Sequence, residues 1–205
     1  IFLEGVKMNN IIDPYDYDDA NRMFYGSRYL EIQDHIASTG NGAGNKVLDV
    51  VCRTGFITGG LLRIGALQTI VVDHSDEMLA FLQDKFIGAE GYVGLDCRLG
   101  NANELPVEDN TVDSSFIGMS LNDFSNPSQI ISEMARTTKS DGKIIIFDAE
   151  FANNTSKVFP GMEITQAETL LTEAGLLKMS TEKLGTLQNQ DNLEASPYII
   201  SANVP

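Results

Sequence analysis

The sequence predicts an α/β fold in which helices cover a mainly parallel sheet. Three observations predict this class: short apolar runs rich in β-branched residues, amphipathic segments between them, and turn residues at the junctions. Strands that alternate with helices pack into a parallel sheet, because each helix returns the chain to the edge where the next strand starts. A chain of 205 residues is long enough for one such domain with a sizeable core.

The first half of the alternation runs from residue 46 to residue 99. Its predicted elements are strands at 46–50, 69–72 and 95–99 and helices at 56–64 and 76–86. The first strand is a compact apolar run bounded by glycine and asparagine, as buried strands often are. Ser75 suits the N-cap of the second helix, whose first turn carries Asp76 and Glu77 against the helix dipole.

The second half of the alternation extends to residue 202. Its predicted elements are strands at 112–117, 143–148, 176–184 and 198–202 and helices at 127–134 and 164–175. The segment SDG, residues 140–142, is expected to form a turn before the strand KIIIFD. Because no helix separates the last two strands, we expect an antiparallel hairpin at one edge of the sheet.

The segment before the alternation is expected to form a cap. We predict an N-terminal extension and cap helix over residues 1–38 and a single domain over residues 39–205. The extension is rich in Tyr and Asp and is predicted to be helical from about residue 20 to residue 36. Such a cap would cover the carboxyl ends of the strands, where α/β sheets bind ligands. Whether residues 1–7 are native or an upstream remnant is left open.

The charge of the chain limits its partners. A formal net charge of −15 repels phosphate backbones and anionic lipids, so nucleic acid and membrane partners are disfavoured. No apolar run approaches the roughly 20 residues that cross a bilayer, and the N-terminus lacks the regions of a signal peptide. We therefore expect a cytoplasmic protein that acts on a small molecule. Assembly into a homo-oligomer is left open.

Few groups suit metal binding or dinucleotide binding. Cys52 and Cys97 cannot by themselves form a disulfide framework or a metal cluster, so we expect reduced thiols and no metal site. A nicotinamide dehydrogenase needs closely spaced glycines for the pyrophosphate. The turn after the first strand contains only Gly55, which disfavours that class.

Two acids end neighbouring strands at the predicted ligand edge. Asp49 precedes Gly55, at a helix start where backbone N–H groups can face an anionic ligand group. Asp73 ends the next strand, about 20 residues beyond the turn, a spacing that lets a carboxylate accept hydrogen bonds from both hydroxyls of a ribose. Either acid can instead cap a turn, but together they indicate a ligand site.

The order of these segments resembles the class I S-adenosylmethionine-dependent methyltransferases from about Tyr15 to Ala202. VLDVVCRTGFIT resembles their first motif, VVDHSDEML their second, and GNANELPVEDNTVD the loop beside the adenine. EMARTTKSDGKIIIFD and LLTEAGL resemble later segments of the same family. The resemblance implies a Rossmann-like methyltransferase fold, with a mainly parallel seven-stranded sheet, an antiparallel edge hairpin and helices on both faces. It also implies S-adenosylmethionine as the cofactor.

The resemblance further implies which residues contact the cofactor. Asp49 and Gly55 would lie beside its methionine part, and Asp73 would bind its ribose. The other implied cofactor-binding residues are Val51, Arg53, His74, Asn101, Ala102 and Met119. Asn101 stands where the family often has Asp, and its amide oxygen can still accept a hydrogen bond from the adenine.

Val51 and Arg53 depart from the family pattern, which usually has glycine at both positions. Glycine permits positive φ and a close approach of the backbone, whereas a valine with positive φ is strained. The Arg53 side chain could block the pocket, or it could pair with the carboxylate of the cofactor. Two functions therefore stay open: a methyltransferase acting on a small molecule, and a non-catalytic or cofactor-impaired relative that serves as a binding module.

The loop SLNDF, after the fourth strand, supplies the candidate catalytic residues. Asn122 and Asp123 are expected near the transferred methyl group, and Asp123 is the first candidate for orienting or deprotonating an acceptor. Asp123 can also cap the following helix. Asp148, which ends the fifth strand, is a second candidate. The atom that accepts the methyl group is left open.

Three tyrosines of the predicted cap are candidates for closing the site. Tyr15, Tyr17 and Tyr25 would contact the acceptor or the sulfonium of the cofactor. A ring face attracts a cation through its quadrupole. The alternative is that these rings only pack within the cap.

Overall fold

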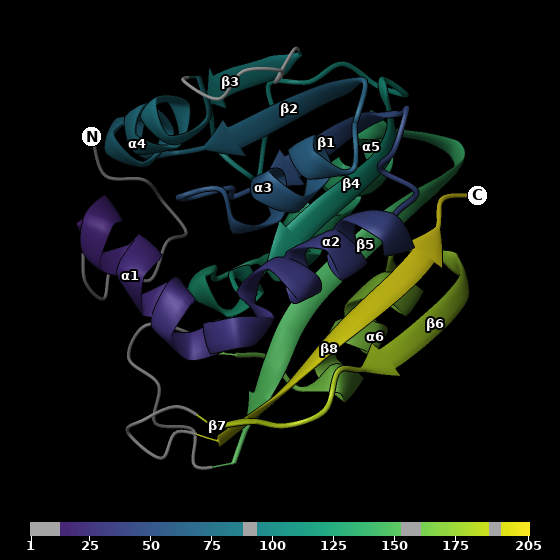
Figure 1. The fold of residues 1–205 in the computed structure, drawn as a ribbon. Helices are drawn as coiled ribbons and strands as arrows, with labels where there is room; N and C mark the ends of the chain where they lie inside the picture. The colour runs from purple at the N-terminus through teal and green to yellow at the C-terminus, as the bar shows by residue number, and fades with distance from the viewer. Residues whose placement is uncertain (1–12, 88–93, 153–160, 189–193) are drawn as a thin grey trace.

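The computed structural model describes residues 13–87, 94–152, 161–188 and 194–205 (Figure 1). Residues 1–7, whose origin was left open, lie outside these ranges. The described residues form one mixed sheet with helices on both faces, which confirms the predicted α/β class. Among the described helices, none combines the length and the apolar character that a membrane span requires.

The sheet follows the order β3-β2-β1-β4-β5-β8-β6, and β7 pairs with β8 off this path. The strands are β1 (Lys46–Val50), β2 (Gln68–Asp73), β3 (Leu95–Leu99), β4 (Val112–Gly118), β5 (Thr138–Phe151), β6 (Leu177–Lys183), β7 (Leu187–Gln188) and β8 (Glu194–Asn203). The first five strands of the path are parallel neighbours, whereas β8 runs antiparallel to both β5 and β6. The seven strands of the path confirm the predicted sheet, and β7 is a short addition.

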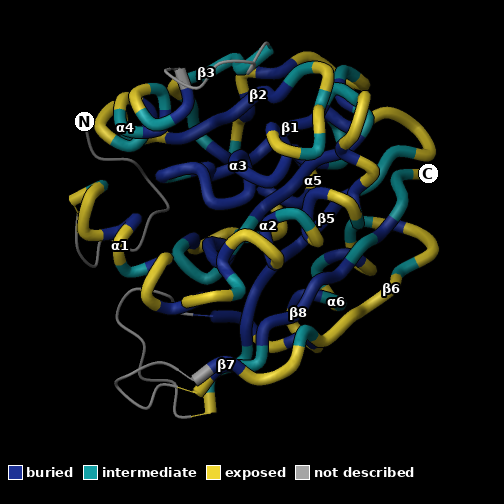
Figure 2. The backbone as a smooth tube through the Cα atoms, viewed as in Figure 1, coloured by how far each residue is buried: buried dark blue, intermediate teal, exposed yellow. Residues whose placement is uncertain are grey.

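The helices form a layer on each face of the sheet. They are α1 (Pro14–Tyr25), α2 (Tyr29–Thr39), α3 (Phe56–Arg63), α4 (Asp76–Ile87), α5 (Pro127–Thr137) and α6 (Ile164–Glu173), with 3₁₀ helices η1 (Gly26–Arg28) and η2 (Leu121–Asp123). Successive β5 side chains point to opposite faces: Ile144 and Ile146 pack with α5 and α6, whereas Ile145 and Phe147 pack with α2 and α3. Figure 2 shows that the central strands are buried and that the edge strand β6 is largely exposed.

The N-terminal segment differs from the prediction of one helix over residues 20–36. The structure has two helices, because Gly26 ends α1 with φ 51° and ψ −130°, a conformation that only glycine adopts readily. The first helix starts earlier than predicted, since the Asp13 side chain accepts the Tyr15 N–H at 2.9 Å and caps it. In Figure 1, α1 lies at the carboxyl ends of the parallel strands, and α2 lies on the sheet face. The predicted boundary at residue 38 stays a prediction.

Strand β5 is longer than predicted, because the segment SDG does not interrupt it. Opposite β4, Val112 faces Thr138 whereas Ser114 faces Lys143, so β5 contains extra residues between these pairs. Within this bulge Asp141 has φ 61°, and its N–H bonds to the carbonyl of Val204 at 3.0 Å. The expected turn residues are therefore accommodated as an irregularity in a continuous strand.

The packing of α2 on α3 predicts that alanine is tolerated at one of two adjacent glycines and destabilises the fold at the other. A Cβ at Gly60 would lie 2.3 Å from the backbone oxygen of Gln33, whereas the nearest atom to a Cβ at Gly59 would be 3.4 Å away. We expect Gly60→Ala to destabilise the fold by roughly 2 kcal/mol, because backbone cannot move aside. Gly59→Ala should be at least as stable as the wild type, since alanine favours the helix. Thermal unfolding followed by circular dichroism measures both, and equal melting temperatures would contradict this packing.

Candidate functional site

The loop between β1 and α3 has an unusual backbone. Val51, Arg53 and Gly55 have φ values of 58°, 48° and 80°. This left-handed region costs roughly 1–2 kcal/mol for a residue with a Cβ, and a β-branched residue such as valine is an outlier there. Gly55 also needs to be glycine for lack of space, because a Cβ would meet Phe86 at 2.7 Å. Val51 and Arg53 thus adopt a backbone conformation that glycine adopts more readily.

Hydrogen bonds to residues of β2 and α4 hold this loop. The Arg53 N–H donates to Asp73 Oδ2 at 2.8 Å, which ties the loop to the end of β2. Lys85, on α4, donates to the Thr54 carbonyl at 2.9 Å and to Asp18 Oδ1 at 2.6 Å. Burial lowers the pKa of Lys85, and its pairing with Asp18 opposes that change. Lys85 therefore links the loop, α4 and the first helix.

The two predicted acids lie buried at the ends of β1 and β2. Asp49, which is 1% exposed, accepts a hydrogen bond from the Thr58 hydroxyl at 2.6 Å. Burial raises its pKa to about 7. Asp73 accepts backbone N–H groups at both oxygens, from Arg53 at 2.8 Å and from Ser75 at 3.0 Å. Each acid lines a separate small cavity, on opposite sides of Val51.

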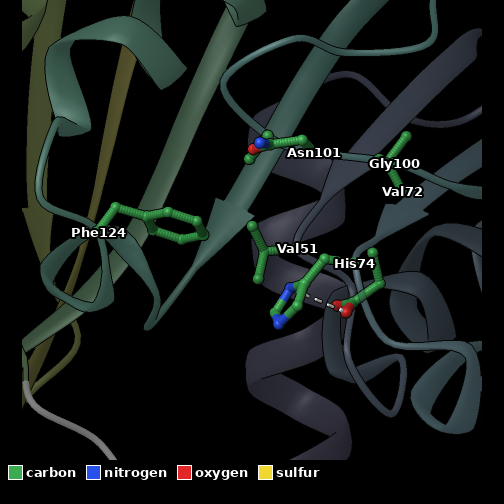
Figure 3. Close-up of a pocket in the computed structure, with 8 residues that line it drawn as sticks. Val51, Val72, His74, Gly100, Asn101 and Phe124 are labelled. Atoms are coloured by element: carbon green, nitrogen blue, oxygen red, sulfur yellow. Dashed lines mark ion pairs between the residues drawn. The ribbon is translucent and has the colours of Figure 1, made fainter. Parts of the chain in front are cut away.

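The cavity beside Asp73 holds the residues that the resemblance placed near an adenine (Figure 3). It has a volume of about 10 Å³ and is lined by Val51, Val72, Asp73, His74, Gly100, Asn101, Ala102 and Phe124. His74 Nδ1 lies 3.5 Å from Asp73 Oδ1. The Asn101 amide oxygen accepts the Asn103 N–H at 2.9 Å. Figure 3 shows the Phe124 ring on the opposite side of this cavity from His74.

The cavity beside Asp49 lies between α1 and the sheet. It has a volume of about 20 Å³ and is lined by Tyr17, Asn21, Tyr25, Asp49, Val51, Cys52, Arg53, Phe56, Ile57, Gly118, Met119 and Phe147. The rings of Tyr25 and Phe56 are stacked, with centroids 4.4 Å apart. The Tyr25 hydroxyl is buried and has no hydrogen-bond partner in the described part of the chain. Such an unpaired buried hydroxyl is uncommon, and it is a group with which a ligand could form a hydrogen bond.

Arg53 places a largely covered cation at the second cavity. Its guanidinium forms an ion pair with Asp123, and its Cζ lies 4.9 Å from the centroid of the Tyr17 ring. Burial alone lowers the pKa of Arg53, but Tyr17, Asp123 and Asp73 together outweigh burial and raise it. The side chain is therefore a fixed positive charge between α1, the loop and η2.

The remaining sequence candidates take different places. The Asn122 amide donates to the Gly161 carbonyl and so ties η2 to the segment before α6. Asp123 is paired with Arg53, which lines the cavity beside Asp49, but Asp123 is not itself among the lining residues of either cavity. Tyr15 is 69% exposed and makes an edge contact with Phe81 at 4.8 Å, outside both cavities. The structure thus brings Tyr17 and Tyr25, but not Tyr15, to the candidate site.

Asp148 is a buried acid whose charge interacts with that of Arg53. Its Oδ1 accepts the N–H groups of Ala149 at 2.8 Å and Met162 at 3.0 Å. Burial raises its pKa to about 7, with Asp123 adding to the rise and Arg53 opposing it. A carboxyl group that titrates near neutral pH suits general acid–base chemistry, and it also makes the stability of the fold depend on pH.

Sequence reasoning missed several lining residues. Phe124 and Gly100 directly adjoin predicted residues, so a wider reading of the same loops would have found them. Asn21, Phe56 and Phe147 gave no comparable signal, because a polar residue in an acidic segment and aromatic residues in apolar runs have ordinary structural roles. Their place in the site depends on how α1 and α3 pack on the sheet.

Comparison with known proteins finds similarities in sequence and in fold. Residues 48–146 match the family model described as a methyltransferase domain. Demethylmenaquinone methyltransferase of Shouchella clausii is 36% identical over 108 residues, covering 52% of this chain and 46% of that protein. Ubiquinone/menaquinone biosynthesis C-methyltransferase UbiE of a Marinomonas species is 31% identical over 136 residues, covering 64% and 54%. The chain thus spans about half the length of the curated relatives that it matches.

Solved structures agree on the fold. The crystal structure of an S-adenosylmethionine-dependent methyltransferase from Aquifex aeolicus superposes with a TM-score of 0.71 at 20% identity, covering 95% of this chain and 100% of that one. The predicted Rossmann-like methyltransferase fold is therefore confirmed, and the segment that carries the first motifs matches a methyltransferase domain.

Because the pKa of Asp148 is raised, we predict that Asp148→Asn increases the free energy of unfolding by an amount that depends on pH. In the folded chain the pKa rises from 3.8 to about 7, so ionisation of the buried acid removes stability as pH increases through this range. We expect Asp148→Asn to exceed the wild type in free energy of unfolding at pH 8, by an amount on the order of a few kcal/mol. That advantage should shrink steadily as the pH is lowered to 4.

Urea unfolding across this pH range measures the effect. Asparagine keeps an acceptor for both backbone N–H groups, so the substitution removes mainly the charge. The exposed Asp84→Asn is the matched control and should show no such gain. If the free energies of unfolding of Asp148→Asn and the wild type differ by the same amount from pH 4 to pH 8, the pKa of Asp148 is not raised.

Proposed function

We propose that this chain is an S-adenosylmethionine-dependent methyltransferase that acts on a small-molecule acceptor. The observation that carries the proposal is the pair of buried carboxylates, Asp49 and Asp73, on either side of a loop with positive φ at Val51, Arg53 and Gly55. Such a loop can bring its backbone close to a ligand. The match of residues 48–146 to a methyltransferase domain supports the same function.

The residues present fit the chemistry of this cofactor. Each Asp73 oxygen accepts one N–H, and a carboxylate oxygen has a further lone pair that can accept a ribose hydroxyl. His74, Asn101 and Phe124 surround the cavity that would hold the adenine. The two cavities, about 10 and 20 Å³, are much smaller than an adenosyl group, so side chains must move for it to enter. Val51 lines both cavities and is the wall between them.

Methyl transfer would depend mainly on the alignment of the acceptor atom with the methyl group. The cofactor, when bound, supplies an electrophilic methyl group on a sulfonium. The chain would position the acceptor against it, and Asp123 and Asp148 are the groups able to orient an acceptor or take its proton. Both lie near the carboxyl ends of β4 and β5, and Asp148 is poised by its pKa of about 7.

A planar, uncharged acceptor is favoured. The rings of Tyr25, Phe56 and Phe147 line the cavity between α1 and the sheet, and aromatic walls favour flat apolar molecules. The names of the two relatives, which refer to menaquinone and ubiquinone, support an acceptor of this kind. The net charge of −15 favours it over nucleic acid. A cytoplasmic location and a homo-oligomer stay predictions.

A second function is a non-catalytic protein that keeps the fold as a binding module. The specific observation in its favour is the Arg53–Asp123 ion pair, because the cation that lines the cavity beside Asp49 is already neutralised within this chain. The strained Val51 supports it as well, since a bulky residue divides the space that a cofactor would need. Binding measurements distinguish the two functions.

Asp73→Asn tests the ribose site. We expect the wild type to bind S-adenosylhomocysteine in a calorimetric titration and Asp73→Asn to bind it about tenfold or more weakly, because a charge-assisted hydrogen bond is worth roughly 1.5–3 kcal/mol. Asp76→Asn removes a nearby exposed carboxylate and should bind like the wild type. Absence of wild-type binding at millimolar ligand would exclude the methyltransferase proposal.

Val51→Gly tests whether the wall between the cavities limits binding. Glycine removes the side chain and accepts φ 58° without strain, so we expect affinity for S-adenosylhomocysteine to rise several-fold, about 1 kcal/mol. Val51→Ala keeps the Cβ and should give a smaller rise. Circular dichroism of both variants checks that the fold persists. Weaker binding by Val51→Gly than by the wild type would show that this wall does not obstruct the ligand.

A further inference from the structure

Arg53 is a cation that the fold buries and must neutralise. Its side chain is 18% exposed, and it sits over the face of Tyr17 with Asp123 as its ion-pair partner. Removing most of a guanidinium from water is unfavourable unless an anion accompanies it. Here that anion is Asp123.

The cavity around Arg53 has the donors of an anion site. Tyr25 lines the same cavity, and its hydroxyl is buried and lacks a hydrogen-bond partner among the described residues. Burial raises its pKa well above the usual value, so the phenol keeps its proton and can donate. Asp49, on the cavity floor, is partly protonated near neutral pH because burial raises its pKa to about 7, and this weakens its repulsion of an anion.

Asp123 is the member of the ion pair that a ligand can displace from Arg53. Its side chain is 28% exposed, more than that of Arg53, so water can solvate it after separation at smaller cost. It lies on the three-residue helix η2, whereas Arg53 lies on a loop tied to Asp73. A ligand carboxylate can replace it on the guanidinium, often with two parallel hydrogen bonds.

We propose that Arg53 is the residue that binds the carboxylate of the incoming ligand, and that Asp123 is an internal substitute for this carboxylate until the ligand displaces it. Displacement would separate Asp123 from the guanidinium and leave its carboxylate after the carboxyl end of β4, beside the place of methyl transfer. Ligand binding would thereby release the acid that orients the acceptor. This inference rests on the proposed function, because the cofactor of that function carries an amino-acid carboxylate.

Two probes separate this inference from the proposed function. S-adenosylhomocysteine carries the carboxylate, whereas 5′-methylthioadenosine has the same adenosyl thioether without it. Calorimetry with the full chain measures the dissociation constant of each. We expect Arg53→Gln to weaken S-adenosylhomocysteine binding by about tenfold or more, the loss of a charge-assisted contact, and to change 5′-methylthioadenosine binding by less than about twofold.

Asp123→Asn gives the complementary test and does not depend on the folding of the arginine variant. Without the internal anion, the ligand no longer has to compete for Arg53, so binding of S-adenosylhomocysteine should become several-fold tighter while that of 5′-methylthioadenosine stays constant. Arg63→Gln is the control, because it removes an arginine of α3 that pairs with Asp34 outside the two cavities. It should leave both constants unchanged.

The outcomes are distinct. Equal weakening of both probes by Arg53→Gln would mean that Arg53 acts through the shape of the site, which overturns the inference. Tighter binding of S-adenosylhomocysteine by Arg53→Gln would mean that the guanidinium is only an obstacle, which also overturns it. In both cases wild-type binding of 5′-methylthioadenosine would leave the proposed function standing. A wild type that binds neither probe would remove both.

Discussion

The hydrogen bond from the Arg53 N–H to the buried Asp73 carboxylate is the contact on which the site depends. It fixes the β1–α3 loop against the end of β2 at 2.8 Å, while Val51 and Arg53 adopt positive φ. Left-handed residues with side chains persist only where surrounding contacts over-determine them. Because Asp73 makes this contact, the loop keeps its shape without glycine, and the acid stays at the strand end where a ribose would need it.

The same backbone geometry brings the Arg53 side chain into the site, and the rest of the site adapts to that charge. Asp123 neutralises it, and Tyr17 covers it with a ring face. The first helix is also held by the Lys85–Asp18 ion pair, so its position over the strand ends is linked to the loop by charge. A change in either cation would therefore alter both the cavity and the helix that closes it.

Periodicity was sufficient to predict most of the fold. Apolar runs such as KVLDV and KIIIFD formed β1 and the centre of β5, and the predicted helix at 76–86 agrees with α4 within a residue. Predictions failed where one residue overrides the local pattern. Gly26 breaks a helical segment through its backbone freedom. The SDG segment becomes a bulge because the residues on either side of it pair with β4, while its own backbone bonds to Val204.

The sequence by itself determined the order of elements, the burial of the central strands and the placement of Asp49 and Asp73 at adjacent strand ends, because these depend on contacts near in sequence or on strand order. Only the tertiary structure decided which side chains share the site. Arg53 meets Asp123 across 70 positions, and Tyr25 lines the cavity whereas Tyr15 points away. Such pairings follow from helix packing and loop conformation, which no local pattern of residues encodes.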